Sequence, residues 1–441
     1  MKIKFFAIAA FAATALLASC NRDNLNPDEA GIATSMKVSI NFPRVDTRAG
    51  TDHTDDTNAV IGEATVNTVD IFIYTASGAF SSHRGLNASD FTQVTSSGTA
   101  DKYTTSVKIP TTTGPKSVFA GINMPTSVVN ALIDQPASAL GTAVQTMTRA
   151  QLAGGTNFVM FSVAPVDRTF VESDSDPANS ITITCQRLVA KITVETDAAL
   201  DVSGIPGTLS NYMFAVNHFN TKLFMLQGTT SERRDPNWTT ASFNQSDFDP
   251  AVDGDYAPIL SRASIPSPTI SQYTPRYAAE NTSYGKRKKE ITRVTVRALF
   301  VPNTIWTGTT GNFTENPNTG TPGTTFYAVT PNVVAGTAFF LSPTVAADFA
   351  TERGGTVVTY SGGRCYWDIF LGKNNTPPNK WDVLRNDFYK CNITKINALG
   401  RSYEDIPSGE EDDTPETDTN ISAYIDILFW HTPVLSNYIL E

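Results

Sequence analysis

The amino-acid sequence predicts an all-β protein that contains two β-sandwich domains in tandem, a few short helices and a C-terminal strand. Short segments rich in Thr, Val, Phe and Tyr alternate apolar with polar residues, and clusters of Gly, Pro, Asn and Asp separate them at sandwich-like spacing. The chain has 441 residues, enough for more than one domain core. Similar strand patterns recur in its two halves. Two domains of the same all-β kind account for these three observations.

The strands are predicted from apolar side chains at every second position. The clearest segments of this kind are residues 68–75, 103–109, 116–122, 181–184, 188–196, 212–216, 222–226, 291–300, 366–371 and 388–396. Residues 125–152 differ, because Ala, Leu, Gln and Met dominate there without β-branched alternation. This composition predicts one or two short helices on a connection between strands.

The first 19 residues, 1–19, are predicted to be a lipoprotein signal peptide. Lys2 and Lys4 precede an apolar run, Phe5 to Leu17, that is too short to span a bilayer as a helix. The run ends in Leu17-Ala18-Ser19-Cys20, a lipoprotein cleavage site. Cys20 is therefore the expected lipidated N-terminus, and its lipid is the expected attachment to the membrane.

Residues 20–48 are predicted to be a propeptide that contains a removable first strand. Four apolar side chains alternate with polar ones, as in a half-buried strand, at Met36, Val38, Ile40 and Phe42. Arg44 and Arg48 follow at once. A trypsin-like protease cuts after arginine, so cleavage at either residue would detach this strand. We therefore predict that the strand is removed by proteolysis.

The rest of the chain divides into three predicted regions. We expect an N-terminal sandwich over residues 49–182 and a C-terminal sandwich over 183–403, with the boundary just after Pro177-Ala178-Asn179. Residues 404–441 are predicted to be an acidic linker followed by a strand. The linker, 404–420, has no core-forming residue after Ile406, which is typical of an extended tether.

The C-terminal strand is predicted from a second alternating pattern. Its apolar positions, with those that extend the apolar character beyond it, are Ile421, Ala423, Ile425, Ile427, Phe429, Trp430, Val434 and Leu435. This face resembles that of the removable strand. A chain that loses its first strand and carries a similar strand on a tether can supply that strand to a neighbour, which is β-augmentation by a donor strand.

Together these residues resemble the major fimbrillins of Bacteroidia, which build type V pili. The resemblance rests on the lipoprotein site, the strand at 36–40 with Thr47-Arg48-Ala49-Gly50, the strand at 187–191, the segment 383–390 with Ile393 and Ile396, and the acidic linker with its Phe429-Trp430 strand. It implies two transthyretin-like β-sandwich domains and an outer-membrane lipoprotein precursor. It also implies that an Arg-specific, gingipain-like protease removes the first strand, and that the C-terminal strand of one subunit fills the groove of the next.

The resemblance further implies the sites and the partners. The cleaved bond would be Arg48–Ala49, with Arg44 as the alternative, and the donor would be residues 421–441. Pro433 departs from an unbroken strand and predicts a bent donor. The implied partners are other copies of the chain, tip and anchor fimbrial subunits, the maturation protease, and host or bacterial surface receptors. The implied final location is a cell-surface fimbrium that supports adhesion.

Other classes of protein find little support in the sequence. The net charge of −10 argues against a nucleic-acid partner. The three cysteines after Cys20 are odd in number and lack CxxC spacing, so Cys185, Cys365 and Cys391 are predicted to be single buried thiols. His53, His83, His218 and His431 are scattered without catalytic or ligand spacing. We therefore predict no enzyme activity, no cofactor and no metal.

Some alternatives stay open. The acidic cluster at 410–413 is interpreted as solvated tether rather than a calcium site, because it lacks the spacing of a calcium loop. The basic cluster at 286–289 is interpreted as a charged approach to a hairpin, or else as a site for an acidic glycan or a neighbour's acidic linker. The tryptophans Trp238, Trp306, Trp367 and Trp381 form either core or a sugar platform. The alternative function is therefore a non-polymerising, glycan-binding surface lipoprotein.

Overall fold

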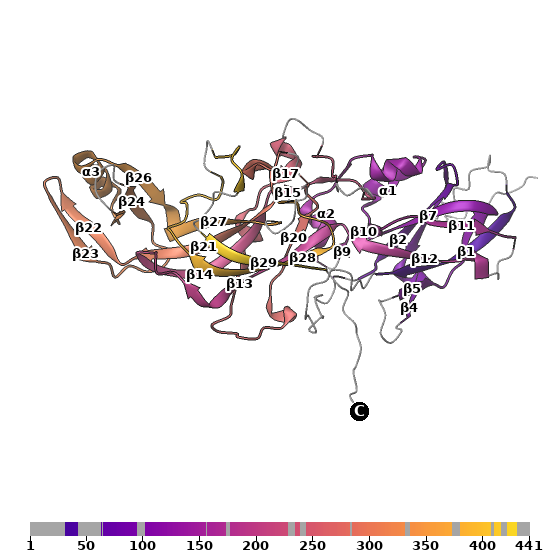
Figure 1. Cartoon of the computed structure of the whole chain (residues 1–441), viewed down its shortest axis with the longest axis horizontal. Helices are drawn as coiled ribbons and strands as arrows, with labels where there is room; N and C mark the ends of the chain where they lie inside the picture. Colours follow the sequence, from indigo (N-terminus) through magenta and orange to yellow (C-terminus); the bar gives the residue numbers. More distant parts are fainter. Residues whose placement is uncertain are drawn as a thin grey trace, which may run out of the picture.

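The structure is a computed structural model. Strands make up most of it, and the helices are few and short. The structure describes residues 31–42, 63, 65–94, 102–155, 157–172, 177–227, 234–238, 244–282, 285–330, 336–372, 380–406, 410–415 and 421–429. An N-terminal part and a C-terminal part follow one another along the long axis of an elongated molecule (Figure 1). The predicted all-β, sandwich-like fold is thereby confirmed.

The N-terminal part contains ten paired strands within the described residues. In spatial order they are β3 (Phe80–Asn87), β2 (Thr68–Thr75), β7 (Gly114–Ile122), β10 (Met160–Ser162), β12 (Ser180–Arg187), β1 (Ala33–Asn41), β5 (Lys102–Thr105) and β4 (Phe91–Val94), while β11 (Val166–Phe170) joins β7 and β6 (Ile109–Thr112) joins β1. β12 pairs with β1 through residues 180–184 and with β10 through residues 185–187. It therefore connects the two halves of this sheet around one apolar core.

Two short helices lie on the connection after β7, as the composition of residues 125–152 predicts. They are α1 (Thr126–Leu132) and α2 (Arg149–Ala153), and β9 (Asn157–Phe158) follows them. Thr148 and Gln151 cap the start of α2, since each side-chain oxygen accepts a hydrogen bond from the other residue's backbone N–H, at 3.3 and 2.9 Å.

The C-terminal part is a sandwich of two sheets. One sheet has the order β19 (Leu260–Ser261), β13 (Val189–Asp201), β28 (Asp387–Ile396) and β29 (Ile421–Phe429), with β20 (Arg276–Ala279) also on β13. The other has the order β18 (Ala257–Pro258), β14 (Gly207–Asn217), β21 (Arg293–Pro302) and β27 (Arg364–Phe370). Ile192, Val296 and Trp367 are part of the core between them. β13 lies parallel to β28 as β1 lies parallel to β12, which gives the two parts a common arrangement.

A separate module is inserted between β21 and β27, at the left end of Figure 1. It consists of the hairpin β22 (Thr304–Thr309) and β23 (Asn312–Pro317), the strands β24 (Phe326–Thr330), β25 (Ala338–Phe340) and β26 (Thr356–Tyr360), and the helix α3 (Pro343–Arg353). Phe340 and Phe349 are in its own small core. Ser342 caps α3, since its hydroxyl accepts a hydrogen bond from the N–H of Val345 at 3.4 Å.

The two parts meet at a buried junction. The predicted boundary at residue 182 falls inside β12, which stays in the N-terminal sheet up to Arg187, because Ile181, Ile183 and Cys185 all point into its core. The chain changes sheet at Leu188. β8 (Gln145–Thr146) pairs with β16 (Lys222–Leu223) across the junction.

The remaining short elements lie on the connections between these strands. β15 (Phe219–Asn220) pairs with β17 (Phe248–Asp249). The single 3-10 turns are η1 (Ala88–Asp90), η2 (Ala137–Gly141), η3 (Pro177–Asn179), η4 (Gln245–Asp247), η5 (Asp253–Asp255), η6 (Ile270–Gln272), η7 (Lys288–Glu290) and η8 (Ser361–Gly363). The turn η7 begins in the basic cluster at residues 286–289.

Candidate functional site

β1, the strand predicted to be removable, is an interior strand of the N-terminal sheet. Residues 37–41 of β1 pair in parallel with β12. Residues 39–41 also pair with β5, which lies on the side of β1 away from β12. Residues 33–36 pair with β6. The N–H of Val38 also donates to the hydroxyl of Thr105 at 3.1 Å. Removal of β1 therefore breaks hydrogen bonds with strands on both of its sides.

The four apolar side chains of this strand lie in the core. Met36, Val38, Ile40 and Phe42 are 1%, 0%, 0% and 3% exposed. The ring of Phe42 packs edge-on against Tyr103, with ring centroids 5.9 Å apart. At about 1.5–3 kcal/mol for each fully buried side chain, the four contribute roughly 6–12 kcal/mol. Loss of β1 would thus leave an apolar groove with unpaired backbone on β12 and on β5 and β6.

The predicted processing sites fall outside the described residues. These are the lipidated Cys20 and the cleavage residues Arg44, Arg48 and Ala49. The described chain stops at Phe42, just after the end of β1, and resumes at Glu63. Asn41 lies opposite Thr184, so β1 runs toward the junction end of β12.

Glu63 fixes the chain again at the junction. Its carboxylate accepts hydrogen bonds from Lys191 at 3.0 Å and from the hydroxyl of Tyr277 at 2.7 Å, and its backbone oxygen accepts one from Arg187 at 2.9 Å. Glu63 and Lys191 are 2% and 0% exposed. Burial lowers the pKa of Lys191 to about 8, and the carboxylate of Glu63 acts in the opposite direction. Because Arg187 belongs to β12, Lys191 to β13 and Tyr277 to β20, this cluster joins both parts of the molecule.

The predicted donor strand lies in the chain's own C-terminal sheet. β29 pairs antiparallel with β28 at the edge of that sheet. Ile425 is buried, Ile421 and Ala423 are half-buried, and Tyr424 is 71% exposed. Ile427 and Phe429 are part of the strand, whereas Trp430, Val434 and Leu435 lie outside the described residues.

β29 is held less firmly than β1. It pairs with one strand of the described sheet, whereas β1 pairs with strands on both sides. A cavity of about 40 Å³ is lined by Ile421, Ala423 and Ile425 together with Phe370 of β27 and with Trp381. Close packing is thus incomplete beneath the strand.

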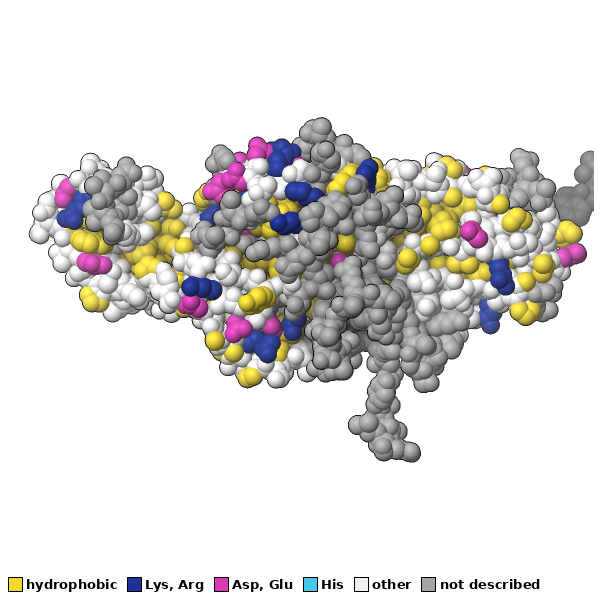
Figure 2. Space-filling view, viewed as in Figure 1, with side chains coloured by type: hydrophobic (Ala, Val, Ile, Leu, Met, Phe, Trp, Pro, Cys, Tyr) yellow, Lys and Arg dark blue, Asp and Glu magenta, His cyan; other side chains and the backbone are white. Residues whose placement is uncertain are grey.

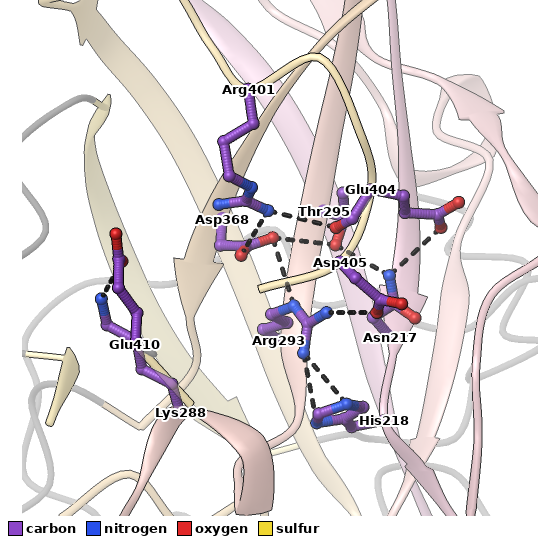
Figure 3. Close-up of polar contacts among 10 residues, drawn as sticks. All are labelled: Asn217, His218, Lys288, Arg293, Thr295, Asp368, Arg401, Glu404, Asp405 and Glu410. Carbon is purple, nitrogen blue, oxygen red and sulfur yellow. Dashed lines mark hydrogen bonds and ion pairs between the residues drawn. The ribbon is translucent and has the colours of Figure 1, made fainter. Parts of the chain in front are cut away.

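Ion pairs hold the segment between β28 and β29 (Figure 3). Arg401 donates to Asp368 at 2.8 Å, and buried Arg293 lies 3.6 Å from the carboxylate of Asp405. Further along, Lys288 pairs with Glu410 at 3.1 Å. The prediction of an unpacked tether from residue 404 onward is therefore wrong for residues 404–406 and 410–415, because basic side chains of the sandwich bind the acidic ones.

A buried histidine completes the inner part of this cluster (Figure 3). Nη1 of Arg293 lies 3.1 and 3.2 Å from the two ring nitrogens of His218, and the ring nitrogen without a proton accepts its hydrogen bond. Burial, and then the charge of Arg293, hold the pKa of His218 well below its usual range, so the ring is neutral. Together, His218 and Arg293 hold the C-terminal segment at Asp405 against the sandwich.

The other residues considered from sequence do not come together as a site. Trp238, Trp367 and Trp381 are buried and Trp306 is half-buried, which argues against a shared exposed platform. His83 and His218 are buried in different parts, and His53 and His431 lie outside the described residues.

Three cysteines are buried thiols that form no disulfide, as predicted: Cys185, Cys365 and Cys391. Burial raises the pKa of Cys185 to about 12. Among the described residues, no group of His, Cys, Asp and Glu is arranged to hold a metal ion. No helix in that part of the chain is long and apolar enough to cross a membrane.

Comparison with known proteins identifies the class. Residues 35–206 match the family model "Major fimbrial subunit protein (FimA)", and residues 358–434 match "Major fimbrial subunit protein type IV, Fimbrillin, C-terminal". Both describe structural subunits of fimbriae rather than enzymes. In these two regions, which contain most of β1 and all of β29, the chain belongs to the major fimbrial subunit families. It is accordingly a fimbrial subunit of the cell surface that assembles with other fimbrial subunits.

Two solved structures share the fold at low sequence identity. Two proteins of Parabacteroides distasonis ATCC 8503, each described as a "putative cell adhesion protein", are 12% and 14% identical with TM-scores of 0.53 and 0.51. The first alignment covers 90% of this chain and 99% of that chain, and the second covers 91% and 98%. A fimbrilin of Porphyromonas gingivalis W83 is 10% identical with a TM-score of 0.48, over 90% of this chain and 98% of its own. No curated protein sequence matches the chain.

Proposed function

We propose that the chain polymerises into a type V pilus by donor-strand exchange, after proteolysis removes its N-terminal strand. The observation that carries the proposal is the position of β1, a buried interior strand that ends just before Arg44 and Arg48. In the uncleaved precursor β1 fills its own groove and keeps the subunit monomeric. The precursor is proposed to reach the outer membrane as a lipoprotein anchored through Cys20.

Cleavage is proposed at Arg48–Ala49, with Arg44 as the alternative, by an Arg-specific protease. Either cut leaves the whole of β1 on the removed fragment, since the strand ends at Asn41. Glu63 supports this step, because its buried contacts fix the chain downstream of both sites to the junction. Residues from Glu63 onward therefore stay attached to the junction when the new N-terminus forms.

The proposed donor is residues 421–441 of another copy of the chain. β29 and β1 are each 9 residues long and both alternate apolar side chains. As an edge strand, β29 leaves its sheet by breaking one ladder. Refilling the groove returns roughly 6–12 kcal/mol of apolar burial and adds ladder hydrogen bonds at about 0.5–1.5 kcal/mol each. The joint is expected to persist chiefly for a kinetic reason, because a strand built into a sandwich leaves only when that sandwich opens.

The proposed assembly also includes tip and anchor subunits at the ends of the polymer. An adhesive role through host or bacterial surface receptors is proposed as well. It is supported by the description of the two structural relatives from Parabacteroides distasonis as cell adhesion proteins.

The test is to incubate the purified precursor with an Arg-specific protease and to follow its size on gels without boiling. The cleaved protein is expected to give a ladder of oligomers. The Arg44→Ala, Arg48→Ala double variant and a variant that lacks residues 421–441 are expected to stay monomeric. A cleaved, full-length chain that remains monomeric would contradict the proposal, and so would assembly that persists without either arginine.

A further inference from the structure

Two oppositely charged segments, far apart in the sequence, meet on the C-terminal sandwich. The basic cluster is residues 286–289, Lys-Arg-Lys-Lys, and the acidic segment is residues 410–413, Glu-Glu-Asp-Asp. Figure 2 shows acidic and basic side chains next to one another on this part of the molecule, while the visible N-terminal face carries fewer charges. The acidic segment lies between β28 and β29, on the path to the proposed donor strand.

Three ion pairs join the two segments. The ammonium of Lys288 lies 3.1 Å from the carboxylate of Glu410 (Figure 3). The guanidinium of Arg287 and the ammonium of Lys289 both reach the same oxygen of Asp412, at 3.0 and 2.6 Å. These cations lower the pKa of Asp412, the hydrogen bond from Lys289 having the largest effect.

Backbone hydrogen bonds fix the alignment of the two segments. The N–H of Lys288 donates to the carbonyl oxygen of Asp413 at 2.9 Å, and the N–H of Lys289 donates to that of Glu411 at 3.1 Å. Charge attraction alone would leave the acidic segment free to slide, but these two bonds set one register.

Contacts with residues outside the acidic segment also hold the basic cluster in place. Lys286 pairs with the buried carboxylate of Asp382, and its ammonium lies 5.1 Å from the ring centroid of Trp238. Arg287 pairs with Glu290, and the side chain of Lys288 is only 3% exposed. The cluster is therefore a preorganised surface and not a set of free side chains.

We propose that the basic cluster and the acidic segment form an ionic clasp, which keeps β29 in its own sheet until a neighbouring groove is ready. This inference rests on the proposed function, because it assigns a control step to the same donor strand. While the clasp is closed, the chain from Asp413 to Ile421 reaches at most roughly 27 Å. When it opens, the last buried residue before it in the described chain is Ile406, and the reach from there to Ile421 becomes roughly 51 Å. Opening thus nearly doubles the distance over which the strand can be delivered.

The clasp is sensitive to salt, whereas the apolar groove is not. Asp412 and Glu410 are 67% and 47% exposed, so mobile ions screen these pairs. The screening length falls from about 30 Å at about 0.01 M salt to about 3 Å at about 1 M. Salt is therefore expected to open the clasp without weakening the finished joint.

The test compares hydrogen exchange of the β29 amides in full-length, uncleaved protein. The clasp variant is Glu410→Gln with Asp412→Asn. The matched control, Asp134→Asn with Glu172→Gln, removes the same two charges from exposed side chains of the N-terminal part, for which the described structure gives no ion pair. The clasp variant is expected to exchange roughly three- to thirtyfold faster than wild type, as expected for the loss of three partly exposed ion pairs. The control should match wild type, and salt should accelerate wild type more than the clasp variant.

Equal exchange in the clasp and control variants would overturn the clasp. A second measurement distinguishes failure of the clasp from failure of the proposed polymerisation. After cleavage, the clasp variant should build the oligomer ladder faster than the control and reach the same final lengths. If cleaved wild type makes no ladder while the exchange difference holds, the polymerisation proposal fails and the clasp stands. If wild type polymerises but the exchange rates do not differ, only the clasp fails.

Discussion

Truncation of a β1 side chain should destabilise the precursor while leaving the mature subunit untouched. Ile40 is fully buried, lies opposite Ile183 of β12 and also pairs with Tyr103 of β5. Ile40→Ala removes apolar contacts and leaves a cavity, at a cost of about 2–5 kcal/mol. The population with an open groove then rises by roughly thirtyfold or more. Because cleavage after Arg44 or Arg48 removes residue 40, the mature chains of the variant and of wild type are identical.

The assay is denaturant unfolding of uncleaved protein, followed by cleavage and gel analysis. The matched control is Lys37→Ala, which changes an exposed side chain of the same strand. We expect a lower free energy of unfolding for Ile40→Ala, no comparable change for Lys37→Ala, and polymers of equal stability from both.

Two results would refute this reasoning. An Ile40→Ala precursor as stable as the Lys37→Ala control would mean that the buried side chain of Ile40 contributes nothing to the packing of the core. Polymers that differ in stability after complete cleavage would mean that residue 40 stays in the mature assembly.

Three further outcomes are expected. Glu63→Gln should destabilise the fold by about 3–5 kcal/mol in denaturant unfolding, since buried Lys191 loses its carboxylate, and adding Lys191→Met should recover much of the loss. Burial raises the pKa of Asp235 to about 7 from 3.8, so the folded state holds a proton that the unfolded state releases; the free energy of unfolding should fall as the pH rises from about 4 to 7, and Asp235→Asn should reduce that slope. Phe349→Ala should weaken the inserted module by about 3–5 kcal/mol in thermal unfolding yet leave the oligomer ladder unchanged.

Alternation in the sequence was sufficient to predict the strands that matter most for function. Residues 68–75 form β2 as predicted, and the apolar positions 36, 38, 40 and 42 are buried. The strand at 36–42 shows a period of two because its apolar face lies in the core. β2 is buried on both faces, and its β-branched and aromatic residues mark it as a strand.

Pairing between distant segments was not predictable in the same way. The pattern at 421–429 marks a strand but carries no information about which sheet edge it joins. The basic and acidic clusters are both plain in the sequence, while their mutual contact depends on how the sandwich folds. Glu63 is a lone carboxylate between Gly62 and Ala64, and its role arises only from residues brought to the junction.

The inserted module was missed for a local reason. Residues 303–325 are rich in Thr, Gly and Asn, and the hairpin of β22 and β23 that they contain is largely exposed. An exposed two-stranded ribbon has little apolar alternation to reveal it. Its small core forms where Trp306 of β22, Phe313 of β23 and Phe340 of β25 pack around Phe349 of α3.

The most direct test of the central claim is the amide exchange of β12 and β5 in three forms of the protein. These strands flank β1 and should be protected in the uncleaved precursor. They should exchange fast in cleaved protein that lacks residues 421–441, and be protected again in the polymer of cleaved, full-length chains. Protection of β12 and β5 that persists in the cleaved, tailless monomer would contradict the account, because it would show that removal of β1 opens no groove.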